Sequence, residues 1–348
     1  MYLDDNNIDF ILPWIDPSDK TWQKEKAYYE RTSNTEDNAS QTRFRDMHTL
    51  KYVLRSIEKH CPWYNKIYLI STGHYPKWLN LSHPKIDLIT HEELFIDKSN
   101  LPVFNSHAIE MNLANIPQLS ENFIYLNDDT LIWKELKRDR FFKNGKVVDF
   151  FHHGWIPRNK VFTFFKGKDT WVDALNNNLE LLNNTVVPKQ LSTEQLYHPS
   201  YGIKHKISNY LFQNVYKDLF WINHWHHPQP YKKETIQKVF EIYKDKMLEV
   251  STHKFRSSSD ITPYLYRYWH LLTGDFEPYF HNDGHVVKAS SLADLEHSIE
   301  KIEENNTINF ICFNDQAKNI SDKEFIKLSE GLSLYLEEKF PHKASFEN

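Results

Sequence analysis

The sequence predicts an α/β sandwich built on a largely parallel sheet, and three observations support this fold class. Strand-like and helix-like segments alternate over residues 1–150, which is the chain order of α/β proteins. Some strand-like runs are apolar on both faces, as Phe123–Leu126 is, and buried parallel strands have this composition. Polar residues follow such runs directly, at the sheet edge where α/β proteins bind ligands.

The first 60 residues predict one strand and two helices. Residues 8–12, which are apolar except for Asp9, form a strand, and Pro13 ends it because proline lacks the N–H that a strand donates. We predict a helix over residues 20–32, followed by a polar, irregular loop over residues 32–42. A second helix is predicted from Asp46, a suitable cap, to His60, because apolar residues recur there at helical spacing.

The next stretch predicts three more strands. Residues 66–72 and 86–89, which are mainly apolar, are the second and third strands. Residues 101–110 lead into a helix that must end before Pro117, because proline disfavours helix at the residue before it. Phe123–Leu126 is the next buried strand, and it breaks into Asn127-Asp128-Asp129.

The second half of the chain is less regular at first. A buried strand is predicted at residues 147–151, and residues 155–223 are rich in Asn, Trp and Phe without a clear period. We expect a largely helical insertion there, acting as a lid or an acceptor subsite. Helices follow at residues 232–248, through Leu272 to a stop at Gly274, at 292–305, and from about Asp322 to Phe340.

A late strand at residues 308–313 repeats the earlier pattern, because an apolar run again ends in Asn-Asp, at Asn314-Asp315. We expect this strand to insert into the same sheet as the early ones. The prediction is therefore one composite catalytic domain over residues 1–348.

Composition excludes several classes of protein. The net charge of −5 gives no basic field for nucleic acid. No apolar run approaches 18 residues, and the acidic N-terminus is unlike a signal peptide. Cys61 and Cys312 lie in apolar surroundings and are predicted to be core thiols rather than a disulfide. We expect a soluble, cytoplasmic protein.

Glycine is scarce, and this limits how a phosphate could be bound. The chain has eight glycines and no G-x-G-x-x-G or G-x-x-x-x-G-K sequence. Backbone nests of the P-loop or Rossmann type are therefore not expected to hold phosphate. Arginine, lysine, histidine or a metal ion would have to neutralise the charge instead.

The acidic strand ends are candidates for a metal site. Adjacent carboxylates at Asp128 and Asp129 suit a hard cation such as Mg²⁺ that also binds phosphate oxygens. Neighbouring strand residues point to opposite faces, so both acids face one ion only if the chain turns at Asp128. If the late strand is a neighbour, Asp315 adds a third carboxylate. An ordinary Asn-Asp-Asp turn is the alternative.

Basic and polar residues suggest how an anion could be held. Arg43 and Arg45 precede a predicted helix N-terminus and could bind an anion there, or could be solvated loop charges. Arg256 offers a bidentate donor pair to a phosphate, or could pair with Asp260. Asn105 and Ser106 precede a helix, where they could meet a ligand or simply cap it.

The histidines near residue 226 leave three interpretations open. His224 and His226, two residues apart in an extended segment, could bind Zn²⁺ with a third ligand. A histidine that titrates near neutrality could instead take a proton from a hydroxyl nucleophile. A buried, hydrogen-bonded histidine with a structural role is the third interpretation.

Four ordered blocks carry a resemblance to a known family. They are residues 8–19 (I-D-F-I-L-P-W-I-D-P-S-D), residues 43–133 (with R-F-R-D, L-P-V-F-N-S-H-A-I-E and F-I-Y-L-N-D-D), His226-x-Pro228-x-Pro230 with Phe255-Arg256-Ser257 and Asp260, and residues 310–315 (F-I-C-F-N-D). Together they resemble the Stealth family, the sugar-1-phosphate transferases of microbial capsule and surface-polysaccharide synthesis. This family is also similar to the catalytic part of animal N-acetylglucosamine-1-phosphotransferase. Residues 155–223 fall outside the resemblance.

The resemblance implies a Rossmann-like, GT-A-like fold and transfer of a sugar 1-phosphate from a nucleotide sugar, usually a UDP-sugar, to an acceptor sugar hydroxyl, with release of UMP. The acceptor would be an oligosaccharide or a lipid-linked sugar, and a lipid-linked acceptor implies peripheral association with the inner face of the membrane. It also implies that Asp128, Asp129 and Asp315 hold Mg²⁺ or Mn²⁺, that His226 is the base, and that Arg256 holds the transferred phosphate. Near the nucleotide or the donor sugar it implies a further set: Trp14, Asp16, Arg43, Arg45, Asn105, His107, Glu110 and Asp260.

Three other functions remain as alternatives. A metal-dependent glycosyltransferase would use the same donor and release UDP instead of UMP. A carbohydrate-binding module would use the 10 Trp and 19 Tyr for stacking on sugar rings. A zinc hydrolase would contain zinc in stoichiometric amount.

Overall fold

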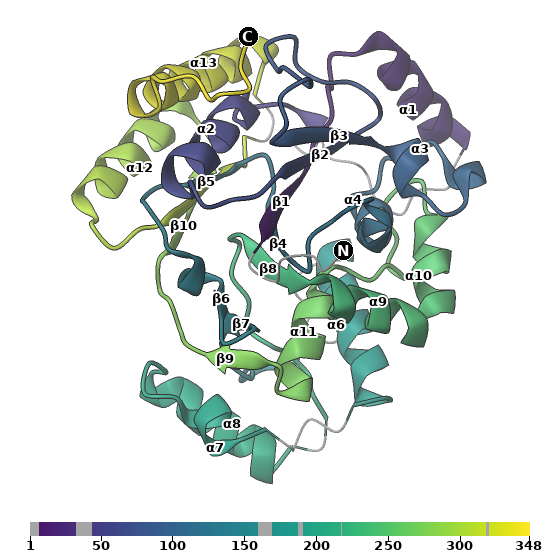
Figure 1. Cartoon of the computed structure of the whole chain (residues 1–348), viewed down its shortest axis with the longest axis vertical. Helices are drawn as coiled ribbons and strands as arrows, with labels where there is room; N and C mark the ends of the chain where they lie inside the picture. The colour runs from purple at the N-terminus through teal and green to yellow at the C-terminus, as the bar shows by residue number, and fades with distance from the viewer. Residues whose placement is uncertain (1–6, 33–43, 159–168, 187–190, 217, 318–319) are drawn as a thin grey trace.

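The computed structural model describes residues 7–32, 44–158, 169–186, 191–216, 218–317 and 320–348. Its central sheet has five strands in the order β3-β2-β1-β4-β8 (Figure 1). The first four are parallel, and β8 is antiparallel to β4. The strands are β1 (Ile8–Pro13), β2 (Ile67–Ser71), β3 (Ile86–Thr90), β4 (Asn122–Tyr125) and β8 (Gln229–Lys232).

Both faces of this sheet are buried, because alternate strand residues enter two separate cores. In β1, Phe10 and Leu12 pack into one core and Ile11 into the other. The first core is covered by α2 (Leu50–His60), α12 (Leu292–Glu304) and α13 (Asp322–Lys339). The second is covered by α4 (Ser106–Glu110), α6 (Thr170–Asn183), α9 (Lys233–Ile242), α10 (Lys244–Ser251) and α11 (Tyr264–Thr273). The predicted Rossmann-like α/β/α fold with a largely parallel sheet is confirmed.

The late strand does not join the central sheet, so that part of the prediction is wrong. β11 (Phe310–Asp315) lies in a second sheet, between β10 (Gly284–Ala289) and β5 (Thr130–Ile132). The physical reason is that the outer edge of β4 is already occupied by β8, whereas β5, which follows the Asp128–Asp129 turn, offers a free edge to β11. The two sheets still share one apolar core, which contains Ile124, Leu131 and Phe310.

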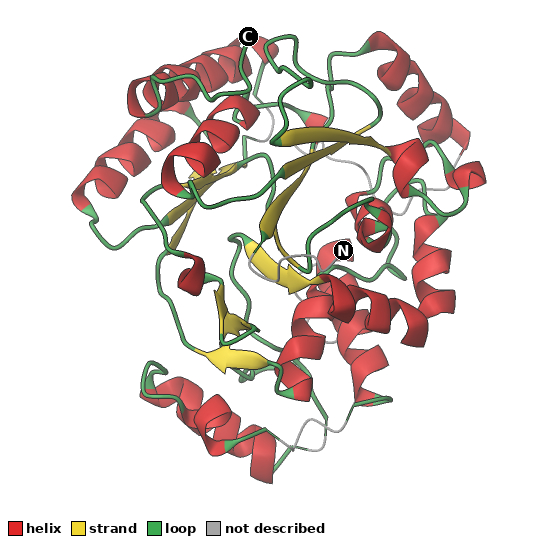
Figure 2. Ribbon diagram, viewed as in Figure 1, coloured by secondary structure: helices red, strands yellow, loops and turns green. Residues whose placement is uncertain are grey.

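A third small sheet and a helical segment complete the chain (Figure 2). The predicted strand at 147–151 is confirmed as β7 (Lys146–Asp149), which lies between β6 (Phe142–Lys143) and β9 (Phe276–Pro278). The segment 155–223 contains α6, α7 (Thr193–Tyr197) and α8 (Ile203–Asn214), so its described part is helical, as predicted. In Figure 1, α7 and α8 lie at the lower end of the molecule, away from the central sheet.

Most predicted helices are present, with some changed boundaries. The one predicted from Asp46 begins at Leu50, because Asp46 Oδ1 accepts a hydrogen bond from the backbone N–H of His48 (2.6 Å) and forms a turn. The helix predicted at 232–248 is divided into α9 and α10. The helix predicted to stop at Gly274 does so, and Gly274 has a φ of 74°. The remaining elements are α1 (Lys20–Thr32), α3 (His91–Leu94), η2 (Lys98–Asn100), η3 (Leu113–Asn115) and η4 (Arg138–Arg140).

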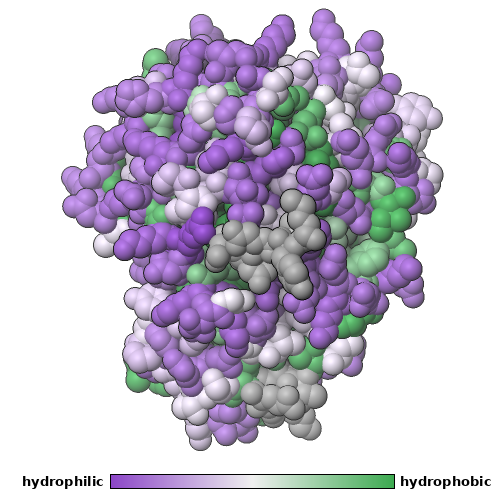
Figure 3. All heavy atoms as spheres, in the orientation of Figure 1, coloured by the Kyte–Doolittle hydropathy of each residue, from purple (hydrophilic) through white to green (hydrophobic). Residues whose placement is uncertain are grey.

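Cys61 and Cys312 are free and buried, as predicted. None of the helices in the described ranges is long and apolar enough to span a membrane. The face of the molecule in Figure 3 is mostly hydrophilic, with its apolar side chains in small groups.

Candidate active site

A cavity of about 840 Å³ opens beyond the carboxyl ends of β1 and β4. This is the place where the α/β fold is expected to bind ligands. The residues that line it come from segments far apart in the sequence. They include Trp14 after β1, Arg45 and Asp46 before α2, His107 and Glu110 in α4, Asp128 and Asp129 after β4, His226 before β8, Arg256 before α11, and Asp315 at the end of β11.

The chain turns after β4, as a shared site for two adjacent acids requires. Asn127 accepts a hydrogen bond from the backbone N–H of Thr130 (3.2 Å), which closes the turn. Asp128 and Asp129 both line the cavity as a result. β5 then runs antiparallel to β11, and this pairing brings Asp315 to the same cavity.

Like charges are crowded at this turn. Burial raises the pKa of Asp128 well above its usual value, and the neighbouring carboxylates of Asp129 and Asp46 raise it further. A set of oxygen donors that repel one another suits a hard cation such as Mg²⁺ or Mn²⁺. Asp46, which the sequence predicts only as a helix cap, also lines the cavity.

Asp315 has a different environment from the other acids. Its carboxylate accepts two hydrogen bonds from Arg45, from Nε to Oδ2 and from Nη2 to Oδ1, both at 2.8 Å. Arg45 lines the cavity and pairs with an acid, so it is not a solvated loop charge. Arg43, predicted beside it, lies outside the described residues.

His226 and His224 do not share a site. His226 is exposed and lies with Asp129 and Cys312, and these three side chains offer ligand atoms within 4.8 Å of one another. Cys312 Sγ also donates to Asp129 Oδ2 (3.3 Å). His224 packs against Trp171 and Tyr264, and burial lowers its pKa to about 3. A single cysteine in an apolar strand is typical of a core, so the sequence does not predict Cys312 beside these two residues.

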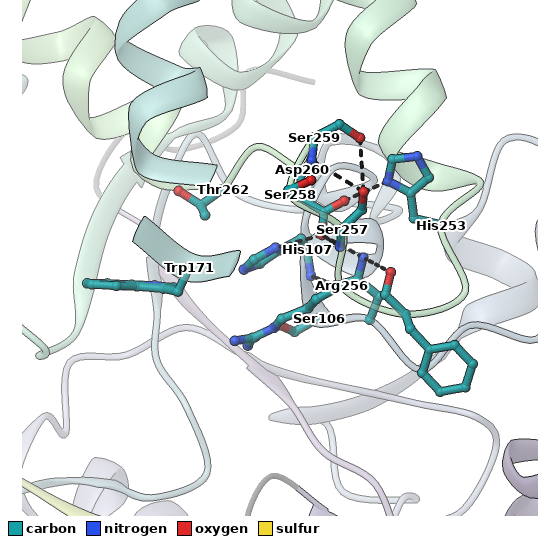
Figure 4. Close-up of polar contacts among 12 residues, drawn as sticks. Ser106, His107, Trp171, His253, Arg256, Ser257, Ser258, Ser259, Asp260 and Thr262 are labelled. Carbon is teal, nitrogen blue, oxygen red and sulfur yellow. Dashed lines mark hydrogen bonds and ion pairs between the residues drawn. The ribbon is translucent and has the colours of Figure 1, made fainter. Parts of the chain in front are cut away.

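Arg256 lies at the N-terminus of α4, as Figure 4 shows. Its Nη2 donates to Ser106 Oγ (3.1 Å). Asn105 caps α4 by accepting from the backbone N–H of His107 (3.1 Å), and its Nδ2 also donates to Asp260 Oδ2 (2.9 Å). The capping interpretation of Asn105 is therefore correct, and the same side chain links α4 to the loop that carries Arg256.

Asp260 joins this loop to α4 without lining the cavity. It is fully buried and accepts hydrogen bonds from Nδ1 of His107 (3.0 Å), Nδ1 of His253 (2.6 Å) and the backbone N–H of Ser257 (3.1 Å) (Figure 4). Burial alone would raise the pKa of Asp260, but these hydrogen bonds hold it well below its usual value. Asp260 therefore positions the residues around it.

Glu110 is a buried acid with one oxygen free for a ligand. Its Oε1 accepts from Tyr125 Oη (2.6 Å), and among the described residues Oε2 has no hydrogen-bond partner. Burial raises the pKa of Glu110 to about 7, although Tyr125 and the charge of Arg256 act in the opposite direction. A buried polar atom without a partner is costly, so a hydroxyl or amide of a ligand would satisfy it.

The two residues predicted after β1 differ. Trp14 lines the cavity, and its buried Nε1 has no partner among the described residues, so its N–H is available to a ligand. Asp16 lies outside the cavity lining, and its Oδ1 accepts from the backbone N–H (2.9 Å) and Oγ (2.6 Å) of Ser18. Asp16 therefore closes a local turn.

Two conserved regions of one protein family match this chain. The description of the first is Stealth protein CR2, conserved region 2, and it matches residues 43–150. The second, Stealth protein CR3, conserved region 3, matches residues 225–272. The matched ranges contain the Asp128–Asp129 turn, His226 and Arg256.

Relatives are similar over almost the whole chain. The capsular polysaccharide phosphotransferase WcwK of Streptococcus pneumoniae is 34% identical over 98% of both chains. The exopolysaccharide phosphotransferase cps2G of Lactiplantibacillus plantarum is 30% identical over 98% of this chain and 96% of its own. The receptor polysaccharide phosphotransferase WefC of Streptococcus oralis is 30% identical over 98% of this chain and 99% of its own.

Similarity to solved structures is much weaker. The galactosyltransferase LgtC in complex with donor and acceptor sugar analogues has a TM-score of 0.34 and 10% identity, covering 92% of this chain and 95% of its own. Mouse xyloside xylosyltransferase 1 has a TM-score of 0.39 and 8% identity, covering 89% of this chain and 99% of its own. These scores are too low to support an inference about this chain.

Proposed function

Because the chain belongs to the Stealth family of polysaccharide phosphotransferases, we propose that it transfers a sugar 1-phosphate from a nucleotide sugar to a hydroxyl of an acceptor sugar. The donor is a UDP-hexose or a UDP-N-acetylhexosamine, the product is a phosphodiester of a capsule or surface polysaccharide, and UMP leaves. The observation that carries the proposal is that His226, Arg256 and the Asp128–Asp129 turn line one cavity.

The reaction needs a base, charge neutralisation and alignment. The acceptor oxygen forms a bond to the β-phosphorus, the bond from that phosphorus to the bridging oxygen breaks, and UMP keeps the electron pair. His226, exposed in the cavity, takes the proton of the acceptor hydroxyl. Arg256 donates to oxygens of the transferred phosphate. Phosphoryl transfer needs little covalent help beyond such positioning.

The acids are proposed to hold the cation. Asp128 and Asp129 would bind Mg²⁺ or Mn²⁺, which neutralises phosphate charge when bound. Asp315 belongs to the proposed set, because its carboxylate, which accepts from Arg45, still has lone pairs available for the ion. Removal of the ion by a chelator should stop transfer, and Mg²⁺ or Mn²⁺ should restore it.

The remaining cavity residues are proposed to recognise the donor and the acceptor. Trp14 and Arg45 are assigned to the nucleotide, and Glu110 with His107 to the donor sugar, because all four line the cavity. Asn105 and Asp260 act behind them by holding His107 and the Arg256 loop in place. Trp171 in α6 also lines the cavity, which supports a role for the insertion in the acceptor subsite.

The released nucleotide distinguishes this proposal from a metal-dependent glycosyltransferase. The protein is incubated with a panel of UDP-sugars, Mg²⁺ and candidate oligosaccharides, and products are identified by mass. A gain of hexose plus phosphate, with UMP, is expected. A gain of hexose alone, with UDP, would replace the proposal with the glycosyltransferase.

We also propose peripheral association with the inner face of the cytoplasmic membrane, where a lipid-linked acceptor would be available. The support is one face of α8, on which Ile203, Ile207 and Tyr210 recur at helical spacing and are 73%, 47% and 56% exposed. Ser208, Asn209 and Phe212 on the opposite face are buried. Lys204 and Lys206 flank the exposed face, and α8 contains no acidic residue, which suits an anionic lipid surface.

A further inference from the structure

We propose that Asp129, His226 and Cys312 form a second cation site, which takes Zn²⁺ or a similar transition-metal ion and inhibits transfer when occupied. The site itself is inferred from the structure alone. Its inhibitory effect rests on the proposed function, in which His226 is the base.

The three side chains come from separate segments and converge. Asp129 follows β4, His226 precedes β8, and Cys312 lies in β11. One ligand atom from each lies within 4.8 Å of the others, and Cys312 Sγ is 3.3 Å from Asp129 Oδ2. Ligand atoms around a tetrahedral Zn²⁺ are separated by about 3.3–3.6 Å, given its usual bond lengths. Only His226, which is exposed, needs to move appreciably.

The donor set determines which cation fits. One sulfur, one imidazole nitrogen and one carboxylate oxygen suit Zn²⁺ or Co²⁺, whereas Mg²⁺ prefers oxygen ligands alone. The set therefore differs from the all-oxygen group of Asp128, Asp129 and Asp315, although the two share Asp129. Three protein ligands leave a fourth position of the ion for water.

Binding exchanges a proton for the ion. The Cys312 thiol now donates to Asp129. When Zn²⁺ binds, the S–H bond breaks, a zinc–thiolate bond forms, and one proton goes to solvent. The imidazole lone pair of His226 is then bound to metal and cannot accept the proton of an acceptor hydroxyl. Asp129 is likewise removed from the site of the hard cation, so transfer stops.

Cobalt provides a direct test, because a thiolate bound to Co²⁺ gives a charge-transfer absorption band in the near ultraviolet. The chain has only two cysteines, so Cys61→Ser is a matched control for Cys312→Ser. Wild type and Cys61→Ser should show the band and release one proton per ion. Cys312→Ser should lose the band. The cobalt dissociation constant of His226→Ala should rise roughly tenfold or more, because the loss of a residue that only hydrogen-bonds to a metal ligand already weakens binding by about this factor.

The proposed site would be wrong if the band persists in Cys312→Ser or if folded wild type shows no band. The cobalt band does not depend on turnover, so it tests the metal site even if the protein does not catalyse the proposed transfer. In the Mg²⁺-supported transfer assay, each variant is compared with its own zinc-free rate. The zinc concentration for half-inhibition should rise roughly tenfold or more in Cys312→Ser and stay unchanged in Cys61→Ser. Equal values for all three proteins would overturn the inhibition.

Discussion

The backbone N–H of Phe313 donates to the carbonyl oxygen of Asp129 at 2.9 Å. This hydrogen bond extends the β5–β11 ladder to the edge of the cavity. It joins the turn after β4 to a strand more than 180 residues later in the chain, so the acids at 128–129 and at 315 line one cavity. The candidate site therefore depends on a sheet that neither half of the chain forms alone.

His226→Gln should reduce transfer by about 10²–10⁴-fold, the usual contribution of a general base. Its side chain is exposed, so the melting temperature should stay that of wild type. His297→Ala, which removes an exposed histidine of α12, is the control and should keep full activity. Initial rates of product formation at saturating acceptor measure the effect. Wild-type rates in His226→Gln would exclude this side chain as the base.

Glu110 should make the fold less stable as pH rises. Its pKa is about 7 in the folded protein, against an ordinary value of 4.5, so the folded state retains a proton that the unfolded state loses. The stability it contributes is complete below pH 4.5 and is lost as pH rises through 7. Between these limits wild type should lose up to about 3 kcal/mol relative to Glu110→Gln, which has no charge to bury.

Urea unfolding of wild type and Glu110→Gln at pH 5 and pH 8 measures this difference. The two proteins should be similar at pH 5, and Glu110→Gln should be the more stable at pH 8. An identical pH dependence in both would show that Glu110 is not held in an unfavourable charged state.

Local patterns predicted individual elements better than their pairing. The period of apolar residues identified β1, α2, α12 and α13, because each buries one stripe or one run. It could not place β11, since an apolar strand ending in Asn-Asp fits an edge of either sheet. Because β8 occupies the outer edge of β4, β11 pairs with β5, and this choice depends on tertiary structure.

The site shows the same division between local and tertiary information. Asp128, Asp129, His226 and Arg256 were predicted from their residue types and from the family resemblance, and all four line the cavity. The sequence did not predict that Cys312 lies beside Asp129 or that Asp260 holds several side chains in place, since each acts through contacts between segments distant in sequence. Tyr125, whose hydroxyl holds Glu110, appeared in the sequence only as an apolar strand residue.

Asp260→Asn should destabilise the protein by about 2–4 kcal/mol at pH 7, because it weakens charge-assisted hydrogen bonds in a buried network. The pKa of Asp260 is lowered in the folded state. Its contribution is therefore present above the ordinary value of 3.8 and is lost as pH falls below it. Urea unfolding at pH 7 and at pH 3 should show the gap between wild type and variant narrowing in acid. Asp245→Asn, at an exposed position of α10, is the control. A gap between wild type and Asp260→Asn that is constant with pH would contradict the charged network.

The exposed apolar face of α8 is predicted to contact the membrane. Replacing Ile203 and Ile207 by Asp removes apolar area that would enter the lipid interface and adds charge that anionic headgroups repel. Each buried Ile contributes up to about 1.5–3 kcal/mol, so binding to vesicles with phosphatidylglycerol should fall roughly tenfold or more in co-sedimentation. Stability should be unchanged, because both side chains are solvated in the folded protein. A matched Ile326→Asp variant, at an exposed position of α13, should bind as wild type does. Equal binding by all three proteins would show that α8 does not contact the membrane. Equal binding to anionic and neutral vesicles would show that Lys204 and Lys206 do not contribute to it.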